Sequence, residues 1–252
     1  MKYVRFEYNG ICQYGILKND TIQFLNTSPF AGGIPINTKV SLSEVRLLPP
    51  CQPSKIVAVG LNYADHAQEM NLPLPEFPAL FFKPPTAVIG PEDTILYPPS
   101  SKQVDYEGEL AIVIGKTASS VSEEQAMDYI FGYTCLNDVT ARDLQNRDVQ
   151  WTRAKGFNTF APIGPVIETE LNPDHLAITT RLNGTIKQQS NTKHFIFKTA
   201  FLVSTISEIM TLYPGDIITT GTPSGIGSMQ PGDVVEIEIE GIGILKNTIK
   251  EK

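Results

Sequence analysis

Two glutamates, Glu107 and Glu109, lie at the start of the very apolar segment VDYEGELAIVIG, residues 104–115. Alternate residues of a strand point to the same side, about 6.5–7 Å apart, so the two carboxylates can converge on one ion. Both faces of the predicted strand become apolar further along, which places the pair at the end of a buried strand. Unpaired charges there are costly, so the pattern fits either a divalent cation or a structural cluster of salt bridges.

A third carboxylate favours the cation. Asp138 directly follows Asn137 in GYTCLNDVTARDLQ, where an apolar strand should reach the edge of a site. The all-oxygen set of Glu107, Glu109 and Asp138 suits Mg²⁺ or Mn²⁺, with Ca²⁺ as an alternative, and no Cys/His grouping suggests zinc. Mg²⁺ prefers six ligands, so about three positions would stay open for water or a chelating substrate.

Several segments are predicted to position these side chains. KIVAVG (55–60) is typical of a buried strand, and the helix formers of NYADHAQEM (62–70) predict a helix with Asn62 as its N-cap. The three prolines of NLPLPEFP (71–78) exclude a helix there, so we expect an extended loop.

Two longer helices are expected further along the chain. Ser122 and Gln125 form a capping-box pattern that predicts a helix over 121–133. Apolar residues at helical spacing predict a second helix within 198–216, which Pro-Gly should end. Strands dominate elsewhere, which indicates an α+β, β-dominated fold with few helices.

The N-terminal part is predicted as a separate small module. Short strands and turns fill it, and Asn9-Gly10 is typical of a hairpin turn. The Pro-rich segment 47–55 is a plausible hinge, so we expect a β-rich module over 1–50 and a catalytic domain over 51–252.

Composition excludes several classes of protein. The net charge of -7 and the lack of a Lys/Arg-rich run argue against a nucleic-acid partner. The three cysteines are scattered, as expected for reduced thiols in the cytosol. We find no signal-peptide core and no apolar run of about 20 residues, so we expect a cytoplasmic protein without membrane contact.

Six motifs, in order, carry a family resemblance: GLNYADHAQEM, FFKPPTAVIG, YEGELAIVIGK, GYTCLNDVTARDLQ, RAKGF and LYPGDIITTGTPSGIG. From about residue 54 to the C-terminus the chain resembles the fumarylacetoacetate hydrolase family. The resemblance implies a mixed β-roll, a homodimer and a small oxo-acid substrate. Members of the family hydrolyse, decarboxylate or tautomerise such acids.

The resemblance also implies roles for the acids and for one histidine. The three carboxylates would be the metal ligands, and His66 and Glu69 would form a catalytic pair on a lid. Their i,i+3 spacing lets them touch on a short helix, where Glu69 orients His66 and His66 activates water. The other two histidines, His175 and His194, lie in polar surroundings without a motif.

Two lysines are assigned by the same resemblance. Lys155 of RAKGF matches the catalytic lysine that faces developing negative charge, although a surface lysine is the alternative reading. Lys83 of FFKPP is expected to support the carboxylates from behind. Asn158 stands where many relatives carry aspartate, a difference that could alter the hydrogen bonding behind Lys155.

The remaining candidates would contact the substrate. Arg142 and Gln145 match substrate-contacting positions, but they could also start an exposed helix capped by Thr140. The glycine-spaced turn 220–227 brings Thr222 and nearby backbone N–H groups to a position that could cradle a carboxylate.

We therefore expect a Mg²⁺- or Mn²⁺-dependent hydrolase that cleaves a C–C bond of an acylpyruvate. Water activated by His66 and Glu69 would attack the distal carbonyl, while the cation stabilises the enolate leaving group and Lys155 steadies its charge. Oxaloacetate decarboxylase and 2-hydroxyhepta-2,4-diene-1,7-dioate isomerase are alternatives that use the same site. A non-catalytic oxo-acid or metal-binding module is a more distant alternative.

Overall fold

In the computed structural model, which describes residues 1–69, 71 and 73–252, strands make up most of the regular structure. The largest sheet has 12 strands among the described residues; in order along its main path they are β4 (Pro35–Ser41), β3 (Thr21–Leu25), β2 (Ile11–Lys18), β1 (Lys2–Tyr8), β14 (Ala161–Glu168), β12 (Ile130–Asn137), β11 (Gly108–Ile114), β17 (Ile217–Thr219), β6 (Ile56–Gly60) and β7 (Ala79–Lys83). Two short strands pair off this path, namely β5 (Arg46–Leu48) with β1 and β8 (Val88–Ile89) with β14. The predicted strand over 55–60 is confirmed as β6.

Two smaller sheets complete the body. One consists of β13 (Thr140–Ala141), β10 (Val104–Tyr106) and β18 (Gly227–Met229), and the other of β16 (Thr185–Asn191), β15 (Ala177–Leu182), β19 (Val234–Ile239), β20 (Gly243–Glu251) and β9 (Thr94–Tyr97). Most neighbouring strands are antiparallel, but β17–β6, β14–β8 and β20–β9 are parallel. The mixed, β-dominated fold predicted from the sequence is confirmed.

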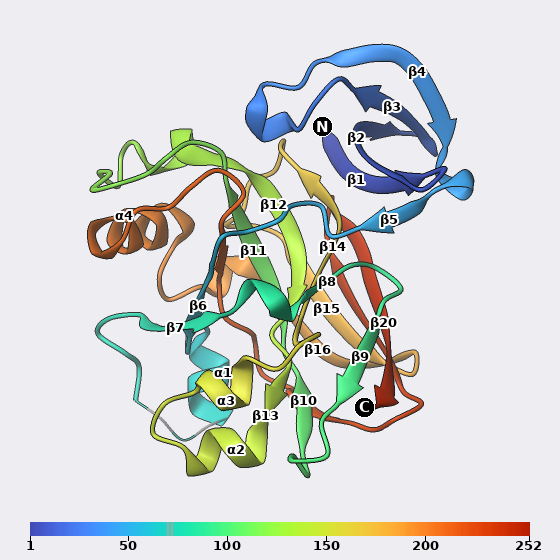
Figure 1. Cartoon of the computed structure of the whole chain (residues 1–252). Helices are drawn as coiled ribbons and strands as arrows, with labels where there is room; N and C mark the ends of the chain where they lie inside the picture. Colours follow the sequence, from blue (N-terminus) through green and yellow to red (C-terminus); the bar gives the residue numbers. More distant parts are fainter. Residues whose placement is uncertain (70, 72) are drawn as a thin grey trace.

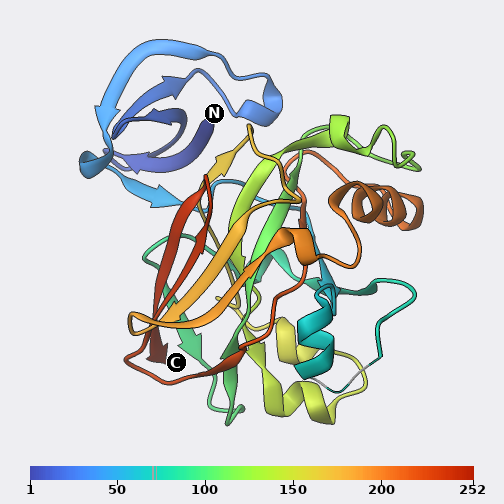
Figure 2. The ribbon, with the colours of Figure 1, turned by 180° about the vertical axis from the view of Figure 1, so that it is seen from behind.

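Helices are few and short. Those found in the described part of the chain are α1 (Ala64–Glu69), α2 (Arg142–Arg147), α3 (Thr152–Lys155) and α4 (Thr199–Ile209). Figures 1 and 2 show α1, α2 and α3 gathered at the end of the body that lies away from the N-terminal strands. Among the described residues, no helix has both the length and the apolar character needed to cross a membrane.

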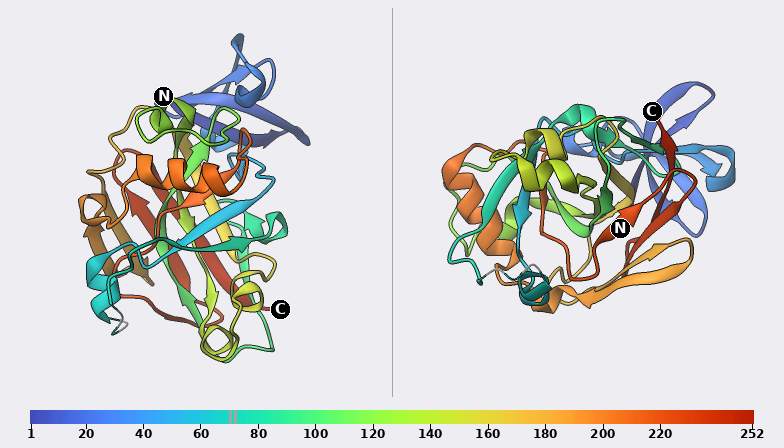
Figure 3. Two further views of the ribbon diagram at one scale, coloured as in Figure 1. Left: turned by 90° about the vertical axis from the view of Figure 1, so that its left-hand side faces the viewer. Right: turned by 90° about the horizontal axis from the view of Figure 1, so that it is seen from below.

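The N-terminal strands continue the large sheet at one end of the molecule (Figures 1 and 3). β1 pairs with β14 through Lys2 opposite Glu168 and Tyr3 opposite Ile167. The predicted hairpin turn between β1 and β2 is confirmed, because Asn9 and Gly10 have φ angles of 51° and 75°.

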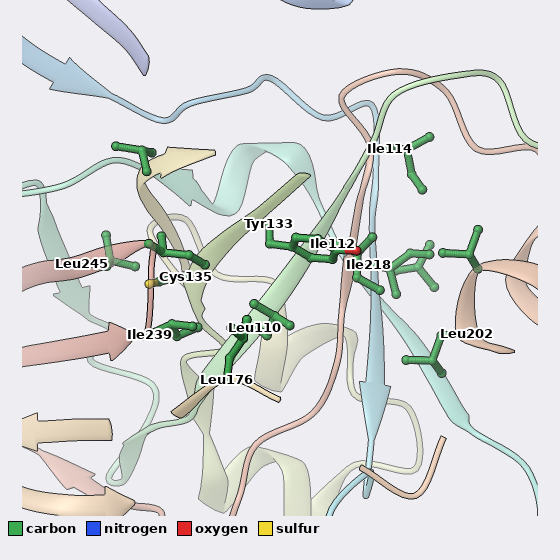
Figure 4. Close-up of a cluster of buried hydrophobic side chains, with 14 of the residues drawn as sticks. Leu110, Ile112, Ile114, Tyr133, Cys135, Leu176, Leu202, Ile218, Ile239 and Leu245 are labelled. Atoms are coloured by element: carbon green, nitrogen blue, oxygen red, sulfur yellow. The ribbon is translucent and has the colours of Figure 1, made fainter. Parts of the chain in front are cut away.

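β11 lies at the centre of the core and is buried on both faces. Leu110, Ile112 and Ile114 face one apolar cluster together with residues of β12, β17 and α4 (Figure 4). Ala111 and Val113, which alternate with them, face a second apolar cluster. A charged side chain at the start of β11 is therefore attached to a strand that is packed on both faces and shielded from water.

The helix predicted over 121–133 is wrong. The chain forms only a 3₁₀ turn at Ala126–Tyr129 and then enters β12 at Ile130. The capping-box pattern is a local preference, whereas residues 130–137 hydrogen-bond to both β11 and β14 and bury apolar side chains between them. The tertiary pairing outweighs the local preference.

The other two predicted helices are present with different ends. α4 stops at Ile209, five residues before Pro214, and α1 covers Ala64–Glu69. Met70 in the predicted helix and Leu72 in the predicted extended loop lie outside the described residues.

Asn62 is not the N-cap of α1. Its side chain donates hydrogen bonds to the carbonyl oxygens of Phe197 and Thr220 and accepts one from the backbone N–H of Phe197. Asn62 is fully buried. Through these hydrogen bonds it joins the start of the α1 segment to two distant parts of the chain.

Candidate active site

The two glutamates lie where the predicted strand 104–115 divides. β10 belongs to the three-stranded sheet and β11 begins at Gly108 in the large sheet, so Glu107 is the link between two sheets. The single continuous strand predicted there is therefore wrong. Glu109, the second residue of β11, is 1% exposed, and Glu107 is also buried.

Asp138 is brought to the glutamates by the pairing of β11 with β12. Gly108 lies opposite Asn137, and the backbone N–H of Asp138 donates to the carbonyl oxygen of Glu107 at 2.9 Å. The Asn137 side chain in turn accepts the backbone N–H of Glu107 at 3.0 Å. One carboxylate oxygen from each acid lies within 4.8 Å of the other two, in the way that ligands surround a single cation.

Three buried cations surround these acids. The Lys155 ammonium lies 2.9 Å from Glu107 Oε2 and 2.6 Å from Asp138 Oδ2, and the Lys83 ammonium lies 2.5 Å from Asp138 Oδ1. Arg142 donates from its guanidinium to Glu107 Oε1. The structure thus places Lys83 behind the carboxylates and Lys155 between two of them, and the reading of Lys155 as a surface lysine is wrong.

The acids differ in how their charge is compensated. Burial would raise the pKa of Glu107, but the neighbouring Lys155 and Arg142 outweigh burial and hold this pKa well below its usual range. Burial raises the pKa of Glu109 well above its ordinary value, and the nearby charges of Asp138 and Glu107 raise it further.

The balance of buried charges shows whether the site fits a metal ion. Four buried acids meet only three buried cations; the acids are Asp105, Glu107, Glu109 and Asp138, and the cations are Lys83, Arg142 and Lys155. Within the described part of the chain Glu109 makes no salt bridge, and its Oε2 atom accepts the backbone N–H of Gly221 at 2.9 Å. A salt-bridge cluster alone leaves Glu109 uncompensated, so the all-oxygen set fits a divalent cation.

His66 lines a cavity that the three acids also line, and Glu69 contacts His66 from the same helix. His66 Nδ1 is 2.8 Å from Glu69 Oε2, and His66 is 7% exposed. Because Nδ1 faces the carboxylate, Nε2 is the ring nitrogen left to exchange a proton with a bound molecule.

Two further contacts hold α1 against the loop that precedes β18. Glu69 Oε1 accepts the backbone N–H of Gly225 at 2.9 Å, and Ser224 Oγ donates to Asp65 Oδ2 at 3.0 Å. Glu69 therefore both orients His66 and anchors the helix that carries it. We name the Ser224–Asp65 and Gly225–Glu69 contacts the α1 latch.

The cavity that these residues line has a volume of about 220 Å³. The three acids, Lys155 and Arg142 form one part of its wall, and His66 forms another. Phe81 and Trp151 add an aromatic wall, with ring centroids 5.2 Å apart in an edge-to-face arrangement, while Gln145 and Asn146 present amide groups. This volume and mixture of polar and aromatic groups suit a small organic acid.

Arg142 and Gln145 lie in this cavity at the start of α2. Arg142 is 7% exposed, so the exposed helix start considered for it is wrong. Thr140 is not the cap of α2, because its hydroxyl donates to the carbonyl oxygen of Asp138.

Thr222 also lines the cavity, but its hydroxyl has partners within the protein. It donates to the carbonyl oxygen of Gly108 at 2.9 Å and accepts from Gln188 Nε2 at 2.8 Å. A carboxylate needs donors, so Thr222 serves in this arrangement to fix the strand between the two glutamates. The role of Thr222 in binding substrate stays a prediction.

Asn158 lies away from the candidate site. It lines a separate hollow with Leu96, Pro98 and Lys252, and within the described residues it has no hydrogen bond to Lys155. No direct contact therefore supports the expected influence of Asn158 on Lys155.

Sequence reasoning missed two functional candidates. Asp105 binds Arg142 from behind, and its signal was its position two residues before Glu107, on the same alternating register. Trp151, the single tryptophan of the chain, had no signal, because only the folded α3 segment brings it to Phe81.

The fold and the site together define a mixed, β-dominated protein whose buried acidic triad fits a divalent cation. A family model described as "Fumarylacetoacetate (FAA) hydrolase C-terminal" matches residues 55–250, and one described as "Rv2993c-like, N-terminal" matches residues 1–50. The chain belongs to the fumarylacetoacetate hydrolase family.

Named relatives of this chain include tautomerases, isomerases and hydrolases. The mitochondrial oxaloacetate tautomerase Fahd2a of Rattus norvegicus is 44% identical over 82% of this chain and 70% of its own. A 2-hydroxyhepta-2,4-diene-1,7-dioate isomerase structure from Mycobacterium marinum is 41% identical, with a TM-score of 0.94 over 100% of this chain and 99% of its own. Maleylpyruvate hydrolase from Sphingobium sp. SYK-6, in complex with manganese (II) ion and pyruvate, is 29% identical, with a TM-score of 0.83 over 100% of this chain and 99% of its own.

Proposed function

We propose that this chain is a divalent-cation-dependent enzyme that moves a proton at the carbon beside the oxo group of a small 2-oxo acid. Keto–enol tautomerisation of oxaloacetate is the first reaction to test. The observation that carries the proposal is the pairing of His66 with Glu69 at 2.8 Å in the cavity that the acidic triad also lines.

The residues of the chain divide the work. Glu69 orients the imidazole, and His66 Nε2 accepts and returns the proton. Arg142 and Lys155 supply positive charge to the substrate carboxylate and to the negative charge that develops on proton loss. Glu107, Glu109 and Asp138 would hold Mg²⁺ or Mn²⁺, which when bound supplies Lewis-acid polarisation of the oxo group.

Two relatives support tautomerisation over the acylpyruvate hydrolysis expected from the sequence. The tautomerase from Rattus norvegicus and the isomerase structure from Mycobacterium marinum are more similar to this chain than the hydrolase from Sphingobium is. Proton transfer also requires less of the pair of His66 and Glu69, because the pair then acts on the substrate directly and has no water molecule to position.

Hydrolysis of an acylpyruvate is the second candidate. The same pair could activate a water molecule, and the cavity of about 220 Å³ has room for a water beside a small acid. The maleylpyruvate hydrolase from Sphingobium, whose structure is in complex with manganese (II) ion and pyruvate, supports this second candidate.

The two reactions are separated by their products. Metal-stripped protein would be reloaded with Mg²⁺ or Mn²⁺, and the loss of enol-oxaloacetate would be followed by its ultraviolet absorbance. Pyruvate formed from oxaloacetate or from acetylpyruvate would be measured with lactate dehydrogenase, which reports decarboxylation or hydrolysis.

We expect metal-dependent loss of the enol without matching release of pyruvate. His66→Ala should lower its rate by roughly 10²–10⁴, whereas His175→Ala, at an exposed histidine outside the cavity, should not. Pyruvate release from acetylpyruvate would instead favour hydrolysis. Absence of all three reactions in the metal-loaded chain would contradict an enzymatic function and favour a binding module.

A further inference from the structure

We propose that Asp105 is a positioning residue that aims the guanidinium of Arg142 at the carboxylate of a bound 2-oxo acid. This inference rests on the proposed function. It concerns a residue outside the acidic triad, the pair of His66 and Glu69, and the substrate-contacting positions.

Asp105 is buried and fully engaged. It is 2% exposed, and its Oδ2 atom accepts from Arg142 Nε at 2.8 Å. Its Oδ1 atom accepts from Ser228 Oγ at 3.1 Å and from Gln103 Nε2 at 3.2 Å. Partners on both carboxylate oxygens fix the plane of the acid, so Asp105 can fix the plane of the guanidinium it contacts.

Strand pairing puts Asp105 behind Arg142. In the small sheet Asp105 lies opposite Thr140 of β13 on one side and opposite Ser228 of β18 on the other. Arg142 follows β13 directly, and its backbone N–H donates to the carbonyl oxygen of Gln103 at 2.8 Å. The backbone of Arg142 and its guanidinium are thus both held at the start of β10, by Gln103 and Asp105.

The guanidinium is held on three sides. Nε donates to Asp105, one terminal nitrogen donates to Glu107 and the other to Gln145 Oε1. Arginine has five N–H donors, so one donor on each terminal nitrogen remains. Arg142 lines the cavity, so these two N–H groups are the donors it can offer to a bound carboxylate.

Asp105 also has an electrostatic role that Glu107 cannot fill. If Asp105 lost its charge, Glu107 would be the only acid paired with Arg142. The guanidinium would then turn towards that candidate metal ligand and away from the substrate. We therefore expect loss of Asp105 to weaken binding of the acid much more than binding of the cation.

Calorimetry on the intact chain can separate the two effects. Mn²⁺ is titrated first, and pyruvate is then titrated into the Mn²⁺-loaded protein as the probe. The variants are Asp105→Asn, Arg142→Lys and the double variant, with Ser228→Ala as a matched control that removes one partner of Asp105 but leaves its bond to Arg142. Asp105→Glu, which retains the carboxylate, is included in case Asp105→Asn does not fold.

Asp105→Asn should weaken pyruvate binding roughly tenfold or more, the scale of one charge-assisted hydrogen bond, while Mn²⁺ affinity changes by less than about threefold. Ser228→Ala should leave both affinities near those of the parent chain. In the Arg142→Lys background the Asp105→Asn change should have less than half of its effect on a logarithmic scale, because the two residues act through one another. Asp105→Glu should bind pyruvate more tightly than Arg142→Lys.

Other results would overturn the inference. Pyruvate affinity in Asp105→Asn within about twofold of the parent chain would do so, as would an undiminished effect in the Arg142→Lys background. If Asp105→Asn does not fold, the comparison of Asp105→Glu with Arg142→Lys decides. The inference is overturned if Asp105→Glu binds pyruvate no more tightly than Arg142→Lys does. A parent chain that binds neither Mn²⁺ nor pyruvate would contradict the proposed function as well, whereas normal binding by the parent with unchanged variants would contradict only the role of Asp105.

Discussion

His66 Nδ1 lies 2.8 Å from Glu69 Oε2, and both residues come from the six-residue helix α1. The contact fixes which ring nitrogen faces the cavity. His66→Ala should lower the rate of enol-oxaloacetate loss by roughly 10²–10⁴, the usual contribution of a general acid–base group. Stopped-flow absorbance at saturating substrate measures this rate, and a rate within about threefold of the parent chain would remove His66 from proton transfer.

The α1 latch predicts a different kinetic effect. Ser224→Ala removes the hydrogen bond to Asp65 while leaving the pair of His66 and Glu69 intact. We expect faster hydrogen–deuterium exchange in α1 and a KM raised by a few fold, because the helix that closes the cavity is held less often in place. Ser43→Ala is the control, because Ser43 is an exposed serine among the N-terminal strands. Unchanged exchange in α1 would show that the latch does not restrain it.

Glu109 allows a direct test of the cation site. Glu109→Gln keeps the shape of a buried side chain that has no salt bridge within the described residues, so the protein should fold with unchanged or greater stability. Its Mn²⁺ affinity should fall by at least about 100-fold, because a carboxylate ligand is lost. Calorimetry would compare it with Glu236→Gln on the half-exposed strand β19. Parent-like Mn²⁺ binding by Glu109→Gln would exclude the triad as the binding site.

Asp216 provides a prediction for stability. This fully buried acid accepts from Lys55 Nζ at 2.6 Å, from the Ser54 hydroxyl at 2.6 Å and from the backbone N–H of Tyr213 at 2.8 Å. It therefore ties the start of β6 to the start of β17. Asp216→Ala should lower the free energy of unfolding by about 1–3 kcal/mol in urea titrations, since charge-assisted hydrogen bonds to a buried acceptor are lost while Lys55 and Ser54 stay in reach of solvent. Asp148→Ala, at an exposed surface pair, should have little effect; equal losses in both variants would contradict this account.

Cys51 predicts how stability depends on pH. Burial raises the pKa of its thiol from 9.0 to about 12. The unfolded thiol ionises from about pH 9, so between pH 9 and 12 the folded state binds the extra proton and stability falls as pH rises. The slope contributed is at most about 1.4 kcal/mol per pH unit. Urea titrations at several alkaline pH values should give a shallower decline for Cys51→Ala than for Cys12→Ala at the exposed cysteine, and identical slopes would argue against this source.

The sequence predicted those features of the fold that depend on neighbouring residues alone, such as a tight turn or a buried apolar run. Asn9-Gly10 has the positive φ angles that a tight hairpin requires, and the apolar run after Glu109 is buried on both faces. The error over 121–133 arose because the helical signal there is a capping pattern. What decides the structure is the pairing of β12 with β11 and β14, which are distant in sequence and leave no local pattern.

The candidate site shows the same division. The triad could be predicted, because strand alternation places Glu107 and Glu109 together and a second apolar segment ends at Asp138. The salt bridges of Lys83 and Lys155 to Asp138 have no local signal, since the two lysines come from β7 and α3, and only the family resemblance pointed to these lysines. Asp105 shares the alternating register of Glu107 and Glu109, but its partner Arg142 is 37 residues away in sequence, so no local pattern indicated their contact.

The acidic triad comes from the β11–β12 pair and the link before it, whereas the aromatic and amide walls come from β7 and from α2 and the residues up to α3. Substitutions in the walls can therefore alter which acids are admitted without moving the cation ligands. The scaffold keeps its chemistry constant while its selectivity is free to diverge, and directed evolution towards new acids should begin at Trp151 and Asn146.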